Sequence, residues 1–328
     1  MNLTDFQKPR VVVSKCIEFD SCRYNGLKIP DAFVAKLMDY VDFHPVCPEV
    51  GIGLGVPRSP VRVISVDGRK ILQQPSTGKE FTGEMENFVE NFLSSLRGVD
   101  GFILKNRSPS CGFVDVKVYA SRDDITGFSR GSGFFGGAVL EKFKGMAIED
   151  EGRLNNFAIR EHFLTKLYAH AFFRMVKESN EINKLIEFHA KNKLLMLGYN
   201  EKHMRIMGQI TANPGKHDTK TVIGDYEKHL TEVFSNVPGC CSMINSILHA
   251  FGWISENLSK KEKEFFLNSV EEYRDERIPL STLIHLLKSW AIRFGNEYLL
   301  SQSFLEPYPK ALTEMDTQGR KRHYDVSG

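Results

Sequence analysis

The chain has 328 residues, of which 41% are hydrophobic and 26% charged, and its formal net charge is +2. This length predicts two domains, and the near-neutral charge does not by itself indicate a nucleic-acid-binding protein. We expect no membrane span, because no apolar stretch is long enough, and no signal peptide, because the N-terminus is polar. Six cysteines in a chain of this length are too few for a disulfide framework, so we expect a cytoplasmic protein.

The first part of the chain alternates strand and helix patterns. Stretches 32–40 and 82–96 are amphipathic and predict helices, the second with Thr82 as its N-cap. Strands that alternate with helices favour a largely parallel sheet. We therefore predict a Rossmann-like α/β domain over residues 1–153, with the polar stretch 149–153 as the junction. The predicted strands are 10–14, 61–66, 101–104 and 114–119.

The second part of the chain, residues 154–328, has helical periodicity over most of its length. Turn signals such as Pro238-Gly239 separate the periodic stretches. We therefore predict an all-α C-terminal domain. Its expected helices are 157–177, 181–197, 226–234, 243–256, 260–275 and 279–294.

Three cysteines, Cys16, Cys47 and Cys111, lie where predicted strands end. The carboxyl ends of parallel strands meet at one edge of a sheet, so cysteines distant in sequence can converge there. Thiolates suit iron–sulfur clusters, which normally take four, and a site with three leaves one iron open as a Lewis acid. Cys22 is either a fourth ligand or a bystander. No C-x-x-C pair is present, so spacing alone does not distinguish cluster ligands from buried, inert cysteines.

Two other features have alternative interpretations. The run 131–136 spells G-x-G-x-x-G, but no strand is predicted directly before it, so a dinucleotide site is not favoured. Cys240 and Cys241 are adjacent, and we interpret them as structural or as a helix start. Residues 191–220 contain six Lys or Arg and two acids, a patch that either contacts a phosphate backbone or is a solvated helix face.

The segments around the cysteines resemble the thiouracil desulfidase family (TudS). The resemblance is carried, in this order, by 14–26, 47–51, 55–58 and 105–112, and it covers residues 1–150. One departure is Ile17-Glu18-Phe19-Asp20, where the family commonly has Leu-Leu-Gly, so the fit of a substrate can differ there.

The second half resembles the YbgA-type helical domain through 185–193 and Met207-Gly208. The two domains fused in this order are similar to desulfidases of the RudS type, which act on 4-thiouridine in tRNA. The resemblance thus implies that the helical domain binds tRNA, and we expect Lys191, Lys193, Lys202 and Arg205 to contact it.

The resemblance implies a [4Fe-4S] cluster held by Cys16, Cys47 and Cys111, whose fourth iron binds the sulfur of a thiolated base. Water then replaces the sulfur at carbon, and sulfide is released without net redox change. Glu49 is the expected general base, and Ser108 is the expected residue to position it or relay a proton. Ser110 is a second candidate for that role, with a structural role as its alternative. A helix cap at Glu49 and a turn role for Ser108 are the alternatives.

The expected reaction converts 4-thiouridine in tRNA to uridine. One alternative is a desulfidase of free thiouracil bases or nucleotides. Another is a sulfide carrier that binds sulfide at the open iron. A zinc or structural-cysteine domain without catalytic activity is the third.

Overall fold

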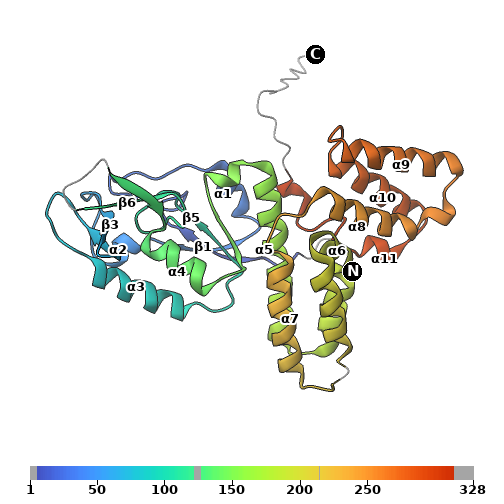
Figure 1. Cartoon of the computed structure of the whole chain (residues 1–328), viewed down its shortest axis with the longest axis horizontal. Helices are drawn as coiled ribbons and strands as arrows, with labels where there is room; N and C mark the ends of the chain where they lie inside the picture. Colours follow the sequence, from blue (N-terminus) through green and yellow to red (C-terminus); the bar gives the residue numbers. More distant parts are fainter. Residues whose placement is uncertain (1–5, 122–126, 214, 314–328) are drawn as a thin grey trace, which may run out of the picture.

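The computed structural model describes residues 6–121, 127–213 and 215–313. An α/β part and a helical part lie side by side along the long axis of the molecule (Figure 1). In chain order the α/β part contains β1 (Arg10–Ser14), α1 (Ala32–Leu37), β2 (Asp42–Val46), α2 (Pro48–Gly51), β3 (Arg62–Val66), β4 (Arg69–Gln73), α3 (Thr82–Ser95), β5 (Gly101–Leu104), β6 (Val116–Tyr119), β7 (Phe128–Gly131), α4 (Phe134–Lys142), β8 (Ala147–Asp150) and the 3-10 helix η1 (Arg153–Asn155).

Two four-stranded sheets form the α/β part. The first has the order β2-β1-β5-β8 and is parallel throughout, which confirms the predicted fold class. The second has the order β4-β3-β6-β7 and is mixed, so the strands predicted over 61–66 and 114–119 do not join the parallel sheet. The reason is the Asp67-Gly68 turn, whose positive φ values of 49° and 78° suit a tight hairpin from β3 to β4.

The parallel sheet is covered on both faces, which explains its continuous apolar strands. Val11 and Val13 of β1 pack on one face with side chains of α1 and of α5 (Phe157–Ser179). Val12, which points the other way, packs with side chains of α3 and α4. The sheet is therefore held between two layers of helices.

The helical part matches the predicted class, but three helices differ clearly from their predicted bounds. One of them, predicted over 243–256, is observed over Cys240–Gly252. The helix predicted over 181–197 continues to Ala212 across a kink at Asn200, whose φ and ψ are −159° and 94°. The next helix begins at Thr219 rather than at 226. Helix α8 begins at Cys240, as the Pro238-Gly239 turn predicted. The helical part contains α5 (Phe157–Ser179), α6 (Ile182–Ala212), α7 (Thr219–Val233), α8 (Cys240–Gly252), η2 (Ser255–Asn257), α9 (Lys260–Arg274), α10 (Leu280–Arg293), α11 (Glu297–Leu300) and η3 (Lys310–Leu312).

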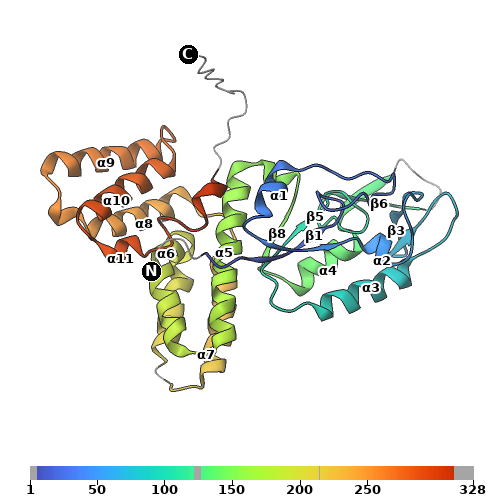
Figure 2. The ribbon, with the colours of Figure 1, turned by 180° about the vertical axis from the view of Figure 1, so that it is seen from behind.

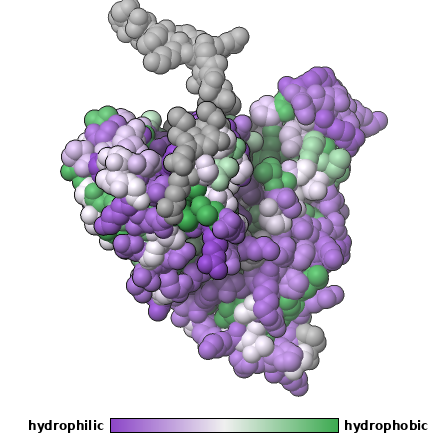
Figure 3. Space-filling model, turned by 60° about the vertical axis from the view of Figure 1, so that its left-hand side comes forward, coloured by the Kyte–Doolittle hydropathy of each residue, from purple (hydrophilic) through white to green (hydrophobic). Residues whose placement is uncertain are grey.

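Figures 1 and 2 show α6 and α7 side by side, with α8 to α11 grouped at the far end of the molecule. The face drawn in Figure 3 is mostly hydrophilic, with small hydrophobic patches. Within the described residues, no helix combines the length and apolar character needed to cross a membrane.

Helix α5 belongs to both parts of the molecule. Its first half supplies Phe163 and Leu167 to the core beneath the parallel sheet. Its second half supplies Phe173 and Val176 to the core of the helical part. The predicted boundary between residues 153 and 154 falls in η1, directly before this shared helix.

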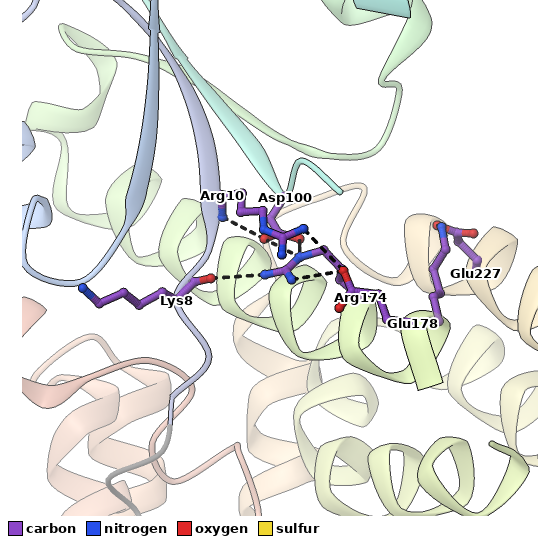
Figure 4. Close-up of polar contacts among 7 residues, drawn as sticks. Lys8, Arg10, Asp100, Arg174, Glu178 and Glu227 are labelled. Carbon is purple, nitrogen blue, oxygen red and sulfur yellow. Dashed lines mark hydrogen bonds and ion pairs between the residues drawn. The ribbon is translucent and has the colours of Figure 1, made fainter. Parts of the chain in front are cut away.

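A buried ion pair fixes α5 to the sheet (Figure 4). Arg174 Nε donates to both carboxylate oxygens of Asp100 at 3.1 Å, and the two side chains are 7% and 2% exposed. Asp100 also accepts from the backbone N–H of Arg10 at 2.8 Å, and Arg174 Nη2 donates to the carbonyl of Lys8 at 3.2 Å. Arg10 begins β1 and Asp100 precedes β5, so the pair lies at the amino ends of these strands.

Candidate functional site

The cysteines predicted as ligands lie on loops that follow three neighbouring parallel strands. Cys16 follows β1, Cys47 directly follows β2 and precedes α2, and Cys111 lies in the loop after β5. Since the strands are parallel, these loops share the carboxyl edge of the sheet, where such folds place ligands. Cys16 and Cys47 are half-buried and Cys111 is buried. The site and the Arg174–Asp100 pair thus lie at opposite edges of the sheet.

Cys22, whose role the sequence left open, lies among these thiols. Its hydrogen bond with Cys16 raises the pKa of the Cys22 thiol to about 11, while a hydrogen bond with Cys47 opposes this effect. The same contact with Cys22, followed by burial, raises the pKa of Cys47. Burial raises the pKa of Cys111. The raised pKa values favour the protonated thiols of Cys22, Cys47 and Cys111 without metal, so metal binding to any of them must release a proton.

The chemistry of the donors suits an iron–sulfur cluster, since thiolates are the usual ligands of such clusters. In residues 6–121, 127–213 and 215–313, no three His, Cys, Asp or Glu side chains converge closely enough to hold one ion. A cubane is wider than one ion, so its ligands surround it instead of meeting at a point. Sulfur ligands on separate loops of one sheet edge suit such a cluster.

Glu49, the predicted base, lies on the first turn of α2 and is 9% exposed. The hydroxyl of Ser110 donates to Glu49 Oε1 at 2.9 Å. Arg58 Nε and Nη2 lie 2.9 and 2.7 Å from Glu49 Oε2. Both oxygens of the carboxylate are thus held in place two residues from Cys47.

The two serines of the Cys111 loop make different contacts. Ser108 Oγ accepts from the backbone N–H groups of Ser110 at 3.3 Å and Cys111 at 3.1 Å. Ser108 therefore shapes the turn that presents Cys111, which was the alternative for this residue. Ser110, fully buried, is the serine that contacts Glu49.

Arg58 also connects separate loops of the site. Its Nη1 donates to the carbonyl of Cys22 at 3.0 Å and to that of Gly55 at 2.9 Å. Its side chain is 4% exposed. Sequence reasoning assigned no role to this arginine, because its partner Cys22 lies 36 positions away and only the fold brings the two together.

The G-x-G-x-x-G run packs against the Cys111 loop. The prediction that no strand precedes this run is wrong, because β7 ends at Gly131 and α4 begins at Phe134. A Cβ at Gly133 would lie 2.4 Å from the carbonyl of Pro109, and one at Gly136 would lie 2.4 Å from that of Cys111. Glycine is required here because backbones touch. The run thus shapes the cysteine loop.

The basic residues predicted to contact tRNA all lie on α6. Lys191 forms an ion pair with Glu187, and Arg205 forms one with Glu201 at 2.6 Å. The kink at Asn200 separates Lys191 and Lys193 from Lys202 and Arg205. Fourteen residues of helix span about 20 Å, so these cations do not form one compact patch. Lys191 also lines a cavity of about 600 Å³ between the N-terminal segment, α5 and α6, remote from the cysteines.

Comparisons with known proteins match two separate stretches of the chain. Residues 11–151 match the family model of 2-thiouracil desulfurase, and residues 193–309 match a family described as a protein of unknown function (DUF1722). The uncharacterized protein YbbK of Bacillus subtilis (strain 168) is 30% identical over 157 residues, which cover 44% of this chain and 98% of YbbK.

Two further relatives cover one part each. The uncharacterized protein YbgA of Escherichia coli (strain K12) is 18% identical over 151 residues, which cover 45% of this chain and 89% of YbgA. A solved structure of the [4Fe-4S]-dependent thiouracil desulfidase TudS is 26% identical, covers 47% of this chain and 98% of its own, and has a TM-score of 0.38.

Proposed function

The chain belongs to the 2-thiouracil desulfurase family, and from this premise we propose that it uses a [4Fe-4S] cluster to remove sulfur from a thiolated uracil. The observation that carries the proposal is the held carboxylate of Glu49 beside a set of thiols on one sheet edge. We assign the cluster to Cys16, Cys47 and Cys111, with one iron left without a protein ligand.

When bound, the cluster would supply an open iron that accepts the soft sulfur of a thione and polarises its carbon. Glu49 takes a proton from the attacking water. Ser110 and Arg58 fix the plane of its carboxylate through one oxygen each. The oxygen of water becomes the carbonyl oxygen, and the sulfur leaves as sulfide, so no electrons are gained or lost.

Apolar side chains near Cys22 suit a flat pyrimidine. Tyr24, Leu27 and Val56 are 42%, 57% and 43% exposed. The carbonyl of Tyr24 accepts from the backbone N–H of Arg58 at 2.8 Å, which places this rim beside the residues that hold Glu49. An aromatic and aliphatic rim of this kind favours contact with the face of a base.

We further propose that the substrate is 4-thiouridine in tRNA, which places the reaction in the cytoplasm. YbbK consists almost entirely of the first domain, so the family fold does not need the helical part. A second domain that matches its own family model is then available to bind a larger substrate. The alternatives are a desulfidase that acts on free thiouracil and a carrier of cluster-bound sulfide.

Anaerobically reconstituted full-length protein tests these proposals against thiolated tRNA and free thiouracil. We expect loss of thione absorbance and release of sulfide, both abolished by Glu49→Gln at unchanged iron content. Glu86→Gln, an exposed glutamate on α3, is the matched control.

Each proposal has its own contrary outcome. Full iron content without sulfide release from either substrate would contradict the desulfidase. Turnover of free thiouracil alone would contradict the tRNA substrate. If the Glu49→Gln protein still binds and releases sulfide as the wild type does, the sulfide carrier is favoured.

A further inference from the structure

One face of strands β6 and β7 in the second sheet is exposed and carries a row of cations. Lys117 of β6 lies directly opposite Arg130 of β7, and both are exposed. Arg62 of β3 lies beside Lys117, because the next residues, Val63 and Val118, are paired in parallel register. It is half-buried, and Ile64, on the same face of β3, is fully buried. Side chains two residues apart on a strand point to the same face of the sheet. The residues two positions away from Lys117 and Arg130 therefore form the next row on this face.

That next row is aromatic. Tyr119 of β6 lies opposite Phe128 of β7. Cations of the first row reach over these rings: Lys117 Nζ lies 4.5 Å from the ring centroid of Phe128, and the guanidinium carbon of Arg62 lies 5.1 Å from that of Tyr119. The face therefore combines positive charge with aromatic surface.

The other face of the sheet is turned inward. Val63, Val116 and Val118 are buried there and pack with Phe134. This alternation fixes which side chains point outward, because a strand cannot exchange its faces without shifting its register. The rows of cations and rings are thus a fixed feature of the fold.

Lys117 and Arg130 repel each other across the two strands. Like charges directly opposite in a sheet destabilise it. Among the described residues no carboxylate forms an ion pair with either one; Asp123 and Asp124, in the connection between the strands, lie outside these residues. Arg130 Nη1 donates to the carbonyl of Asp115 at 3.2 Å. An anion between the two cations would relieve their repulsion.

The cationic row adjoins the candidate site. Strand β6 begins at Val116, five positions after Cys111, and a Cβ at Gly112 would lie 2.5 Å from the Val116 side chain. Gly133, two positions after β7, donates its N–H to the carbonyl of Gly112 at 2.7 Å. Both strands are therefore tied to the loop of Cys111 at the end where Lys117 and Arg130 lie.

We propose that this cation–aromatic face, made of Arg62, Lys117, Tyr119, Phe128 and Arg130, binds the RNA strand that carries the thiolated base. Phosphates contact the cations, and a neighbouring base stacks on Phe128. Cationic grooves with aromatic platforms are how proteins bind single-stranded nucleic acid. The inference rests on the proposed function for the presence of a thiolated base in the RNA. It assigns the strand beside the target base to this face and leaves the rest of a tRNA to the helical part, where Lys191 and Arg205 of α6 are paired with glutamates.

The test measures fluorescence anisotropy of a labelled, unmodified single-stranded RNA with the full-length protein at several salt concentrations. We expect Lys117→Ala/Arg130→Ala to weaken binding about tenfold. The slope of log affinity against log salt should become less negative by about 1.4, since two phosphate contacts are lost at roughly 0.7 each. Phe128→Ala should weaken binding and leave the slope unchanged. Lys260→Ala/Lys261→Ala, exposed cations on α9, is the matched control.

Free-thiouracil turnover is measured in parallel and should not change in these variants. Unchanged RNA affinity of Lys117→Ala/Arg130→Ala, with weaker binding by Lys193→Ala/Lys202→Ala, would place the surface on α6 and overturn the inference. No RNA binding by the wild-type protein would also overturn it, while turnover of free thiouracil would leave the desulfidase intact. An equal loss of free-thiouracil turnover would show a distorted site instead of a lost RNA contact.

Discussion

The guanidinium of Arg58 holds three separate groups: the carboxylate of Glu49 and the carbonyls of Cys22 and Gly55. Truncation to methionine would leave Glu49 buried without its cation and free to turn. Since small misplacements of a reacting group are costly, we expect Arg58→Met to lower kcat about 100-fold with little change in KM. Arg58→Lys should recover part of this loss, because lysine keeps the charge without the two-pronged geometry.

Steady-state kinetics with iron analysis on the same samples would check this expectation. Arg97→Met, which removes an exposed arginine that donates to the backbone carbonyls of Ser94 and Leu96, is the control. Loss of iron together with activity in Arg58→Met would assign Arg58 to the folding of the Cys22 loop and not to the orientation of Glu49.

At this scale the sequence identifies residues more readily than their partners. Cys47 and Glu49 were found because they share one short motif, and the structure places both at the same sheet edge. The sequence named both Ser108 and Ser110 as candidates to position Glu49 and favoured Ser108, whereas Ser110, 61 positions away, is the serine that contacts it. A serine's role depends on which of two neighbouring hydroxyls faces inward, and local sequence does not determine this. The roles of these residues in catalysis stay predictions.

Among the elements, α5 connects the two parts of the molecule through the buried ion pair of Arg174 with Asp100. Asp100 is buried, and burial raises the pKa of its carboxyl, although the hydrogen bond from Arg174 opposes this. Arg174→Met would leave that carboxylate buried without a cation, so we expect a loss of about 3–5 kcal/mol in the free energy of unfolding. Urea unfolding followed by circular dichroism measures it.

The control for this pair is on the same helix. Lys177 and Glu227 lie 2.6 Å apart but are 45% and 41% exposed, so Lys177→Met should cost no more than about 1 kcal/mol. Adding Asp100→Asn to Arg174→Met should recover part of the loss. Equal destabilisation by Arg174→Met and Lys177→Met would contradict a special role for the buried pair.

Elements with a strong apolar period were predicted, and elements shaped by their neighbours were not. Strand β2 has the sequence DFHPV, with a proline and alternate exposed residues, and it is tolerated because it lies at the edge of its sheet. Strand β7 exposes most of its side chains and has no apolar alternation. The end predicted at residue 197 comes shortly before Asn200, where α6 kinks and then continues. Tertiary contacts, and not local pattern, extend that helix to Ala212.

The helical part contains three histidines that are largely shielded from solvent: His170 is buried, and His162 and His189 are half-buried. Burial lowers the pKa of His162 to about 4, that of His170 to about 3 and that of His189 to about 4. His162 and His189 each hydrogen-bond a tyrosine hydroxyl through Nδ1, and His170 Nε2 donates to the carbonyl of Gly145 at 3.2 Å. Nearby lysines, Lys166 for the first two and Lys193 for His189, add to the effect. The folded protein therefore keeps all three rings neutral in mildly acidic solution.

These histidines predict how stability depends on pH. The unfolded chain takes up protons near pH 6.5, while the folded chain resists them until about pH 4, so the unfolded state holds more protons between these values. Stability is therefore complete above pH 6.5 and falls as the pH drops, by up to about 1.4 kcal/mol per pH unit for each histidine.

Thermal unfolding of the full chain from pH 8 to pH 4 should show a steep fall in Tm below pH 6.5. The triple variant His162→Gln, His170→Gln and His189→Gln should start from a lower Tm but fall less steeply, whereas His249→Gln, an exposed control, should parallel the wild type. A triple variant as steep as the wild type would mean that carboxylates, and not these histidine rings, govern acid unfolding.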